Sequence, residues 1–129
     1  MTGVQTCALP IYTISEVAKL LGVSTHTLRY YEKENILIAN RDTNGNRLYE
    51  ESHIKWLQFV MKLKQTQMPI AKIREYARLY TEGEHTTEAR LQLLEDHRKS
   101  IQIQRENLEV TEKMLENKIR AYKNLLENK

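Results

Sequence analysis

Cysteine and long hydrophobic runs are largely missing from this 129-residue chain. The single cysteine, Cys7, cannot form an intramolecular disulfide, and the four scattered histidines offer no zinc-binding spacing. The apolar runs are far too short to cross a bilayer, and no hydrophobic secretory segment opens the chain. We therefore expect no metal, no cofactor, no membrane association and a cytoplasmic location.

The sequence also lacks the residue groupings on which catalysis depends. It has no paired acid and base, no nucleophile constellation and no glycine-rich loop that could hold phosphates. The formal net charge is only +3, but residues 12–81 hold 11 Lys and Arg against 7 Asp and Glu, whereas residues 82–129 hold 9 against 10. A basic front half suits a surface that faces phosphates, although many proteins that bind no nucleic acid share it. The composition argues against an enzyme and weakly favours a nucleic-acid partner.

Local signals predict two short helices at the front of the chain. Residues 13–16, Thr-Ile-Ser-Glu, fit a capping box, and Gly22 ends the helix that follows. Ser24 caps a second helix, which runs from Thr25 to about Asn35. Two short helices joined by a tight turn that contains glycine form a helix-turn-helix.

The pattern between Ile36 and Tyr49 predicts a β-hairpin. Two short extended runs, 38–41 and 47–49, flank the sequence Asp-Thr-Asn-Gly-Asn. An Asn-Gly pair between extended runs is the strongest short-range hairpin signal, because both residues accept a positive φ. A hairpin directly after a helix-turn-helix is a wing.

Two more helices are expected to close the core under the first pair. The third opens at Glu50 or Ser52, and the fourth opens at or beside Pro69. Residues 12–81 then form a winged helix-turn-helix domain of four helices and a hairpin. Residues 82–85 form a linker.

Residues 86–129 contain neither proline nor glycine and predict one long helix. Apolar residues recur along it at heptad spacing, which is typical of a coiled coil. A helix of this length cannot bury its own apolar stripe, so it needs a partner. The candidate dimerisation residues are Leu91, Leu94, Ile101, Leu108, Leu115, Ile119 and Tyr122.

Charged residues within the heptad core favour an antiparallel pair. Arg98 and Arg105 stand in the same heptad row as Glu112. In a parallel pair identical residues face one another and repel, whereas in an antiparallel pair basic and acidic turns can meet. The expected architecture is therefore mostly α, with a winged helix-turn-helix followed by a long C-terminal antiparallel coiled-coil dimerisation helix.

Four motifs in the front half resemble the signature of the MerR family of transcriptional regulators. They are Ile-Ser-Glu-Val-Ala at 14–18, Gly-Val-Ser at 22–24, Thr-Leu-Arg-Tyr-Tyr-Glu at 27–32 and Asn-Gly-Asn-Arg-Leu-Tyr at 44–49. They occur in order and with appropriate spacing. The resemblance implies a homodimer that binds an inverted-repeat promoter and distorts its over-long spacer, so that RNA polymerase can engage both promoter elements.

The resemblance extends further in places and fails in others. Residues 80–83 and 87–90 resemble the small aldehyde- and thiol-stress-responsive branch of the family. Gln67 replaces a frequent glycine before the fourth helix, and Lys62 stands about where thiol-responsive relatives carry a cysteine. We therefore expect no sensing mechanism that needs a thiolate outside Cys7.

The predicted DNA-contacting residues lie at the start of the second helix and in the wing. The first turn of that helix is the end that enters a major groove and reaches base edges. An arginine and a tyrosine further along, and the arginines beside the hairpin tip, suit contacts to phosphate. The full set is Ser24, Thr25, His26, Thr27, Arg29, Tyr30, Arg41, Arg47 and Tyr49.

Some of these interpretations stay open. Tyr31 shares a face with Leu28, which favours core packing. Tyr49 suits a core anchor as well as a phosphate contact, and His26 suits an exposed helix residue without a DNA role. A rival function also stays open, namely a protein-interaction adaptor that uses the same winged helix to bind a protein instead of DNA.

Residues 1–11 are set apart from the fold. The string Met-Thr-Gly-Val-Gln-Thr-Cys-Ala-Leu-Pro-Ile resembles the translation of a common sequencing-library adapter, and a natural disordered arm is the alternative. In the first case the authentic chain begins near Tyr12.

Overall fold

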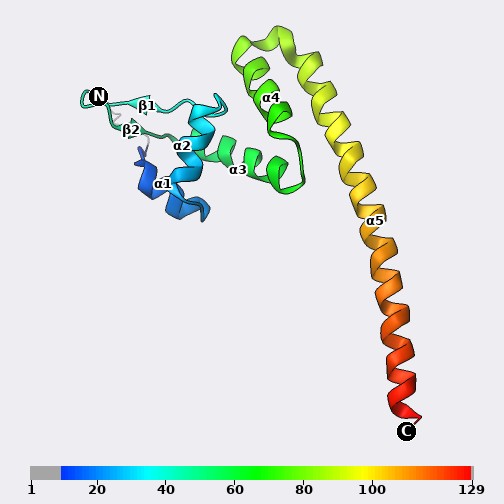
Figure 1. Ribbon diagram of the computed structural model, residues 1–129. Helices are drawn as coiled ribbons and strands as arrows, with labels where there is room; N and C mark the ends of the chain where they lie inside the picture. The colour runs from blue at the N-terminus through cyan, green and yellow to red at the C-terminus, as the bar shows by residue number, and fades with distance from the viewer. Residues whose placement is uncertain (1–9, 129) are drawn as a thin grey trace, which may run out of the picture. The chain divides into compact units, whose positions relative to one another are not determined.

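The computed structural model describes residues 10–128, so the expectation for the opening residues lies mostly outside it. The protein is mostly α-helical with one small hairpin (Figure 1). It divides into two compact units, one up to Arg90 and one from Leu91 onward. The elements are α1 (Ile14–Leu21), α2 (Thr25–Lys33), β1 (Asn40–Arg41), β2 (Arg47–Leu48), α3 (Glu51–Gln65), α4 (Ile70–Glu82), the 3₁₀ turn η1 (Glu84–Thr86) and α5 (Thr87–Glu127).

The helix-turn-helix forms as its capping residues predict. Thr13 Oγ1 accepts a hydrogen bond from the Glu16 amide at 3.2 Å, and Glu16 Oε1 accepts one from the Thr13 amide at 2.9 Å. This capping box starts α1, and Gly22, at a φ of 70°, ends it. α2 ends at Lys33, earlier than expected, because Asn35 adopts a left-handed φ of 61° and turns the chain out of the helix.

The hairpin is present, but its turn differs from the expected one. β1 and β2 pair antiparallel, with Arg41 opposite Arg47. The Gly45 amide donates to the Asp42 carbonyl at 3.1 Å, and the Asp42 amide donates to the Asn46 carbonyl at 3.0 Å. Gly45 has a φ of 80°, but the preceding asparagine does not have a positive φ. The loop is therefore three residues long with only its last residue left-handed, not a two-residue Asn-Gly turn.

The third and fourth helices close the core as expected. Pro69 precedes the first residue of α4, and Gln67 in the turn before it has a φ of 72°. The Trp56 indole of α3 stacks on Tyr76 of α4 at 5.7 Å between ring centroids, and its Nε1 donates to the Ile36 carbonyl at 2.8 Å. The fully buried side chains come from all four helices and from the segments between them, namely Val17, Leu28, Leu37, Tyr49, Leu57, Val60 and Ile73.

The turn between α4 and α5 spans residues 83–86, one residue later than the expected linker. α4 continues to Glu82, Gly83 follows at a φ of 127°, and η1 leads directly into α5. α5 is one uninterrupted helix of 41 residues, which is about 62 Å at 1.5 Å per residue. Among the described residues, no helix is both long and apolar enough to span a membrane.

Candidate nucleic-acid interface

The start of α2 is held by its own polar side chains. Ser24 Oγ accepts a hydrogen bond from the Thr27 amide at 3.1 Å, and the hydroxyls of Ser24 and Thr27 lie 3.0 Å apart. Ser24 is therefore the N-cap of α2, and Thr27 takes part in the same cap. The cap leaves the amino end of the helix in a fixed geometry, which is the end predicted to read bases.

The outer face of α2 carries the exposed members of the predicted set. His26, Arg29 and Tyr30 are all exposed. Arg29 Nη1 donates to Thr25 Oγ1 at 3.3 Å, one helical turn back. This contact directs the guanidinium along the helix towards its amino end, which places a positive charge beside the residues predicted to enter a groove.

The inner face of α2 belongs to the core. Leu28 is fully buried, and Tyr31 retains only a small exposed fraction. Burial raises the pKa of the Tyr31 phenol above its ordinary value. Core packing, the reading that the sequence favoured for Tyr31, is confirmed. One face of this short helix thus packs in the core, and the other exposes the residues that the sequence predicts to contact DNA.

The wing arginines share a partner that sequence reasoning missed. Arg41 Nη2 lies 2.6 Å from Glu32 Oε1, and Arg47 Nε lies 2.7 Å from Glu32 Oε2. Glu32 sits near the end of α2, so one carboxylate joins the wing to α2. Arg41 Nη1 also donates to the Gly45 carbonyl at 2.9 Å, which ties the same guanidinium to the turn.

Tyr49 occupies a position in the core. Its side chain is completely buried, and within residues 10–128 its hydroxyl is the buried side-chain oxygen that has no hydrogen-bond partner. Burial is the main cause that raises the pKa of the phenol, and the charge of Glu32 acts in the same direction. The sequence left Tyr49 open between core anchor and phosphate contact. The structure corrects its place among the DNA-contacting residues, because a side chain this deep reaches no phosphate without rearrangement.

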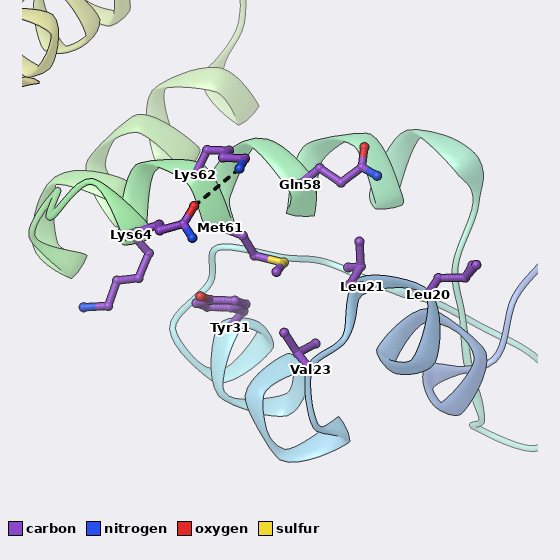
Figure 2. Close-up of a pocket in the computed structure, with 9 residues that line it drawn as sticks. Leu20, Leu21, Val23, Tyr31, Gln58, Met61, Lys62 and Lys64 are labelled. Atoms are coloured by element: carbon purple, nitrogen blue, oxygen red, sulfur yellow. Dashed lines mark hydrogen bonds between the residues drawn. The ribbon is translucent and has the colours of Figure 1, made fainter.

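A groove of about 490 Å³ opens between the helix-turn-helix and the carboxyl half of α3 (Figure 2). Its apolar wall comes from both sides, and lysines of α3 stand at its rim. Lys62 Nζ donates to Gln65 Oε1 at 3.4 Å across one helical turn. The lining residues are Leu20, Leu21, Val23, Tyr31, Gln58, Met61, Lys62, Lys64 and Gln65.

The described residues offer no geometry for a metal ion. No group of three or more His, Cys, Asp or Glu side chains is gathered at one point in residues 10–128. The polar side chains of α2 and the wing are hydroxyls, guanidiniums, asparagine amides, the His26 imidazole, the Lys33 ammonium and the carboxylates of Glu32 and Asp42. Such a set can hydrogen-bond to bases and phosphates without a metal.

The second unit presents the predicted dimerisation residues along α5. Leu91, Leu108, Leu115, Ile119 and Tyr122 are each more than half exposed, and Leu94 and Ile101 are partly exposed. A second apolar stripe is exposed on another side of the helix. It comprises Ile103, Val110, Met114 and Leu125.

Comparison with known families finds two overlapping matches. Residues 12–79 match the family described as MerR HTH family regulatory protein. Residues 54–118 match the family described as MerR, DNA binding. Together the matches cover the winged unit and most of α5.

Individual relatives agree with these matches. The chain is 35% identical over 112 residues to an uncharacterised HTH-type transcriptional regulator of Haemophilus influenzae, covering 86% of this chain and 83% of the relative. It is 38% identical over 89 residues to the HTH-type transcriptional regulator AdhR of Bacillus subtilis, covering 68% and 64%.

Solved structures show the same likeness. The structure of HiNmlR, a MerR family regulator lacking the sensor domain and bound to promoter DNA, superposes with a TM-score of 0.84 at 34% identity over 89% of this chain and 92% of that one. A MerR family regulator from Bacillus thuringiensis gives a TM-score of 0.78 at 31% identity over 85% and 97%.

Proposed function

Because the chain belongs to the MerR family and is a DNA-binding transcriptional regulator, we propose that it works as a homodimer on an inverted-repeat promoter. The observation that carries the proposal is the row of exposed leucine, isoleucine and tyrosine side chains along α5. A soluble helix with such a stripe needs a second apolar surface, and a second copy of itself supplies one of matching length.

The proposed pairing of the two α5 helices is antiparallel. Arg98 and Arg105 share a heptad row with Glu112, and all three stand in one unbroken helix. Antiparallel pairing brings the basic turns of one helix beside the acidic turn of the other, whereas a parallel pair would oppose like charges. In this arrangement α5 is the dimerisation helix, and each copy of the chain contributes one winged domain, residues 12–81.

Each winged domain is proposed to place α2 in a major groove. The first turn of α2, with Thr25, His26 and Thr27, would face base edges, and Arg29 and Tyr30 would contact phosphates. The exposure of His26, Arg29 and Tyr30 supports this assignment. Arg41 and Arg47 would contact the backbone beside the groove from the wing.

The effect on transcription is proposed to come from DNA distortion. A dimer with two heads at a fixed separation can bend or untwist the DNA between its half-sites, and the cost of that deformation depends on the sequence. Such a change would let RNA polymerase engage both elements of a promoter whose spacer is too long. The cytoplasm is the proposed location, and assignment to the aldehyde- and thiol-stress-responsive branch stays a prediction.

The rival functions have less support. The relatives that match most of the chain are transcription regulators, and one similar structure is bound to promoter DNA. These findings disfavour the adaptor that binds only protein. They also give no support to an enzyme, since transcription regulators are not enzymes.

A footprint combined with a salt titration tests the proposed function. The wild-type chain first selects duplexes from a random-sequence library. We expect the selected duplexes to share an inverted repeat, with protection at both half-sites and an affinity that falls steeply with added salt. Single half-sites, or an affinity that does not change with salt, would contradict the dimer on an inverted repeat.

A further inference from the structure

We propose that Glu32 is a positioning residue for DNA binding, which holds both wing arginines in place and thereby raises affinity for DNA. The proposal rests on the proposed function, in which Arg41 and Arg47 contact phosphate. The proposal predicts that loss of the Glu32 charge weakens DNA binding, which is opposite to what charge alone predicts. A carboxylate near the DNA backbone repels phosphates, so its neutralisation would ordinarily strengthen binding.

The wing contains a repulsion that needs a counter-charge. Arg41 and Arg47 are direct cross-strand partners in the hairpin. Like charges in directly opposite positions destabilise a strand pair. Each strand is only two residues long, and a hairpin of this size is marginally stable by itself. Without a nearby acid, the two guanidiniums would push the strands apart at the tip of the wing.

Glu32 lies where its single negative charge pairs with both guanidiniums at once. Its two carboxylate oxygens are used separately, Oε1 on Arg41 at 2.6 Å and Oε2 on Arg47 at 2.7 Å. Because Glu32 belongs to α2 while the arginines belong to β1 and β2, the same contacts fix the distance between the recognition helix and the wing. The geometry thus sets the spacing between the two parts that must meet one duplex together.

The arginines keep donors for a phosphate while Glu32 holds them. A guanidinium has five N–H donors, and Arg47 uses only its Nε on Glu32. The Glu32 side chain is also less exposed than those of its partners, at 20% against 45% for Arg41 and 26% for Arg47. A phosphate that approaches the wing therefore finds more of the two arginine side chains exposed than of Glu32.

The two arginines differ in how far they depend on Glu32. Arg47 stands on β2, and shortly after that strand the chain reaches Tyr49, which is buried in the core and pairs with the Tyr12 backbone at 2.8 and 2.9 Å. Arg41 stands on β1, whose residues are both exposed. We therefore expect the loss of Glu32 to free Arg41 more than Arg47.

Glu32→Gln tests the proposal, and Glu34→Gln is its matched control. Glu34 caps the same end of α2 and makes one ion pair, to Arg74 of α4 at 2.6 Å, away from the wing. Both variants remove one negative charge. With a duplex selected by the wild-type chain as the probe, we expect Glu32→Gln to bind roughly tenfold more weakly, since two side chains lose their pre-organisation. Glu34→Gln should bind as tightly as the wild type or slightly tighter.

A second set of variants separates positioning from general destabilisation. In a chain that already carries Arg41→Gln and Arg47→Gln, adding Glu32→Gln should lower affinity no further, because no guanidinium remains to be held. A further loss in that background would overturn the proposal. Equal or tighter binding by Glu32→Gln alone would overturn it too. Failure of the wild-type chain to bind any selected duplex in a salt-dependent way would instead overturn the proposed function.

Discussion

The exposed heptad residues of α5 give the sharpest test of the proposed dimer. We expect replacement of Leu108 and Leu115 by lysine to produce monomers at micromolar protein concentration. Both positions lie in one heptad row, and each side chain is exposed in the single chain, Leu108 by 68% and Leu115 by 58%. In an antiparallel pair both would be removed from water.

The exposed fractions set the size of the effect. Complete burial of a leucine side chain contributes about 1.5–3 kcal/mol, so a side chain that starts about two-thirds exposed contributes roughly 1–2 kcal/mol. The substitutions occur in both protomers, which makes the total loss roughly 4–8 kcal/mol before any repulsion between lysines. Since about 1.4 kcal/mol is a tenfold change, the dissociation constant should rise by about a thousandfold or more. A dimer with a nanomolar dissociation constant would then have a micromolar or weaker one, so monomers should form a large share of the protein at micromolar concentration.

Sedimentation velocity measures this outcome directly. The matched control carries Gln92→Lys and Glu106→Gln, which together add the same positive charge as the two leucine substitutions. Both positions lie in another heptad row of α5, in which every residue is polar. The control should sediment as the wild-type dimer, and far-ultraviolet circular dichroism should show that both chains keep their helices. An unchanged sedimentation coefficient for the leucine variant would refute the coiled-coil assignment.

Three more outcomes follow from the winged domain. Arg29→Ala should weaken promoter binding by at least about tenfold while dimerisation and helicity stay unchanged, because the proposed function gives Arg29 a charge-assisted phosphate contact in each winged domain. Loss of the dimer, measured by sedimentation, would instead make Arg29 a structural residue. Gln67→Gly should raise the free energy of unfolding, measured by thermal denaturation, by about 0.5–1 kcal/mol. The reason is that Gln67 has a left-handed φ of 72°, which glycine adopts without strain. A destabilised variant would contradict this reasoning. Hydrogen bonds from the backbone amides, chiefly that of Asn46 and then that of Asn44, lower the pKa of Asp42. The contribution of the ionised Asp42 to the stability of the wing is therefore present above the ordinary carboxyl pKa and is lost as pH falls through the lowered pKa. The amide chemical shifts of Asn44 and Asn46 should therefore stay constant until the pH is below the usual carboxyl range. A change at higher pH would contradict the lowered pKa of Asp42.

The helices could be predicted from the sequence because their ends are encoded locally. The Thr13 and Glu16 capping box, the Ser24 cap and the stop at Gly22 all depend on residues within one turn of one another. The same holds for the absence of helix breakers after Thr87. Tertiary packing did not have to be known for any of these.

The parts that escaped prediction depend on contacts between distant residues or on backbone strain. Glu32 lies 15 residues from Arg47, and only the folded wing brings them together. A usable signal existed, since a hairpin register that sets two arginines opposite each other calls for an acid nearby. The burial of Tyr49 depends on the packing of several elements, which no local pattern encodes. Gln67 escaped prediction for a different reason: it replaces a glycine that is frequent in the family, yet the backbone there keeps a left-handed φ.

The two units also bear on how tightly the protein can hold DNA. One winged domain offers a single short helix and a hairpin of two-residue strands, which is a small surface for binding. In the proposed dimer, two such domains are joined through α5, so the second DNA contact becomes intramolecular and affinity rises without any new contact.

The monomeric variant with lysine at 108 and 115 should then bind DNA through one winged domain, with half the phosphate contacts. The slope of log affinity against log salt should fall to about half that of the wild type, because the slope counts the phosphates neutralised. A monomer that keeps the full slope would mean that one winged domain makes all the backbone contacts, and that the paired helices contribute nothing to DNA binding.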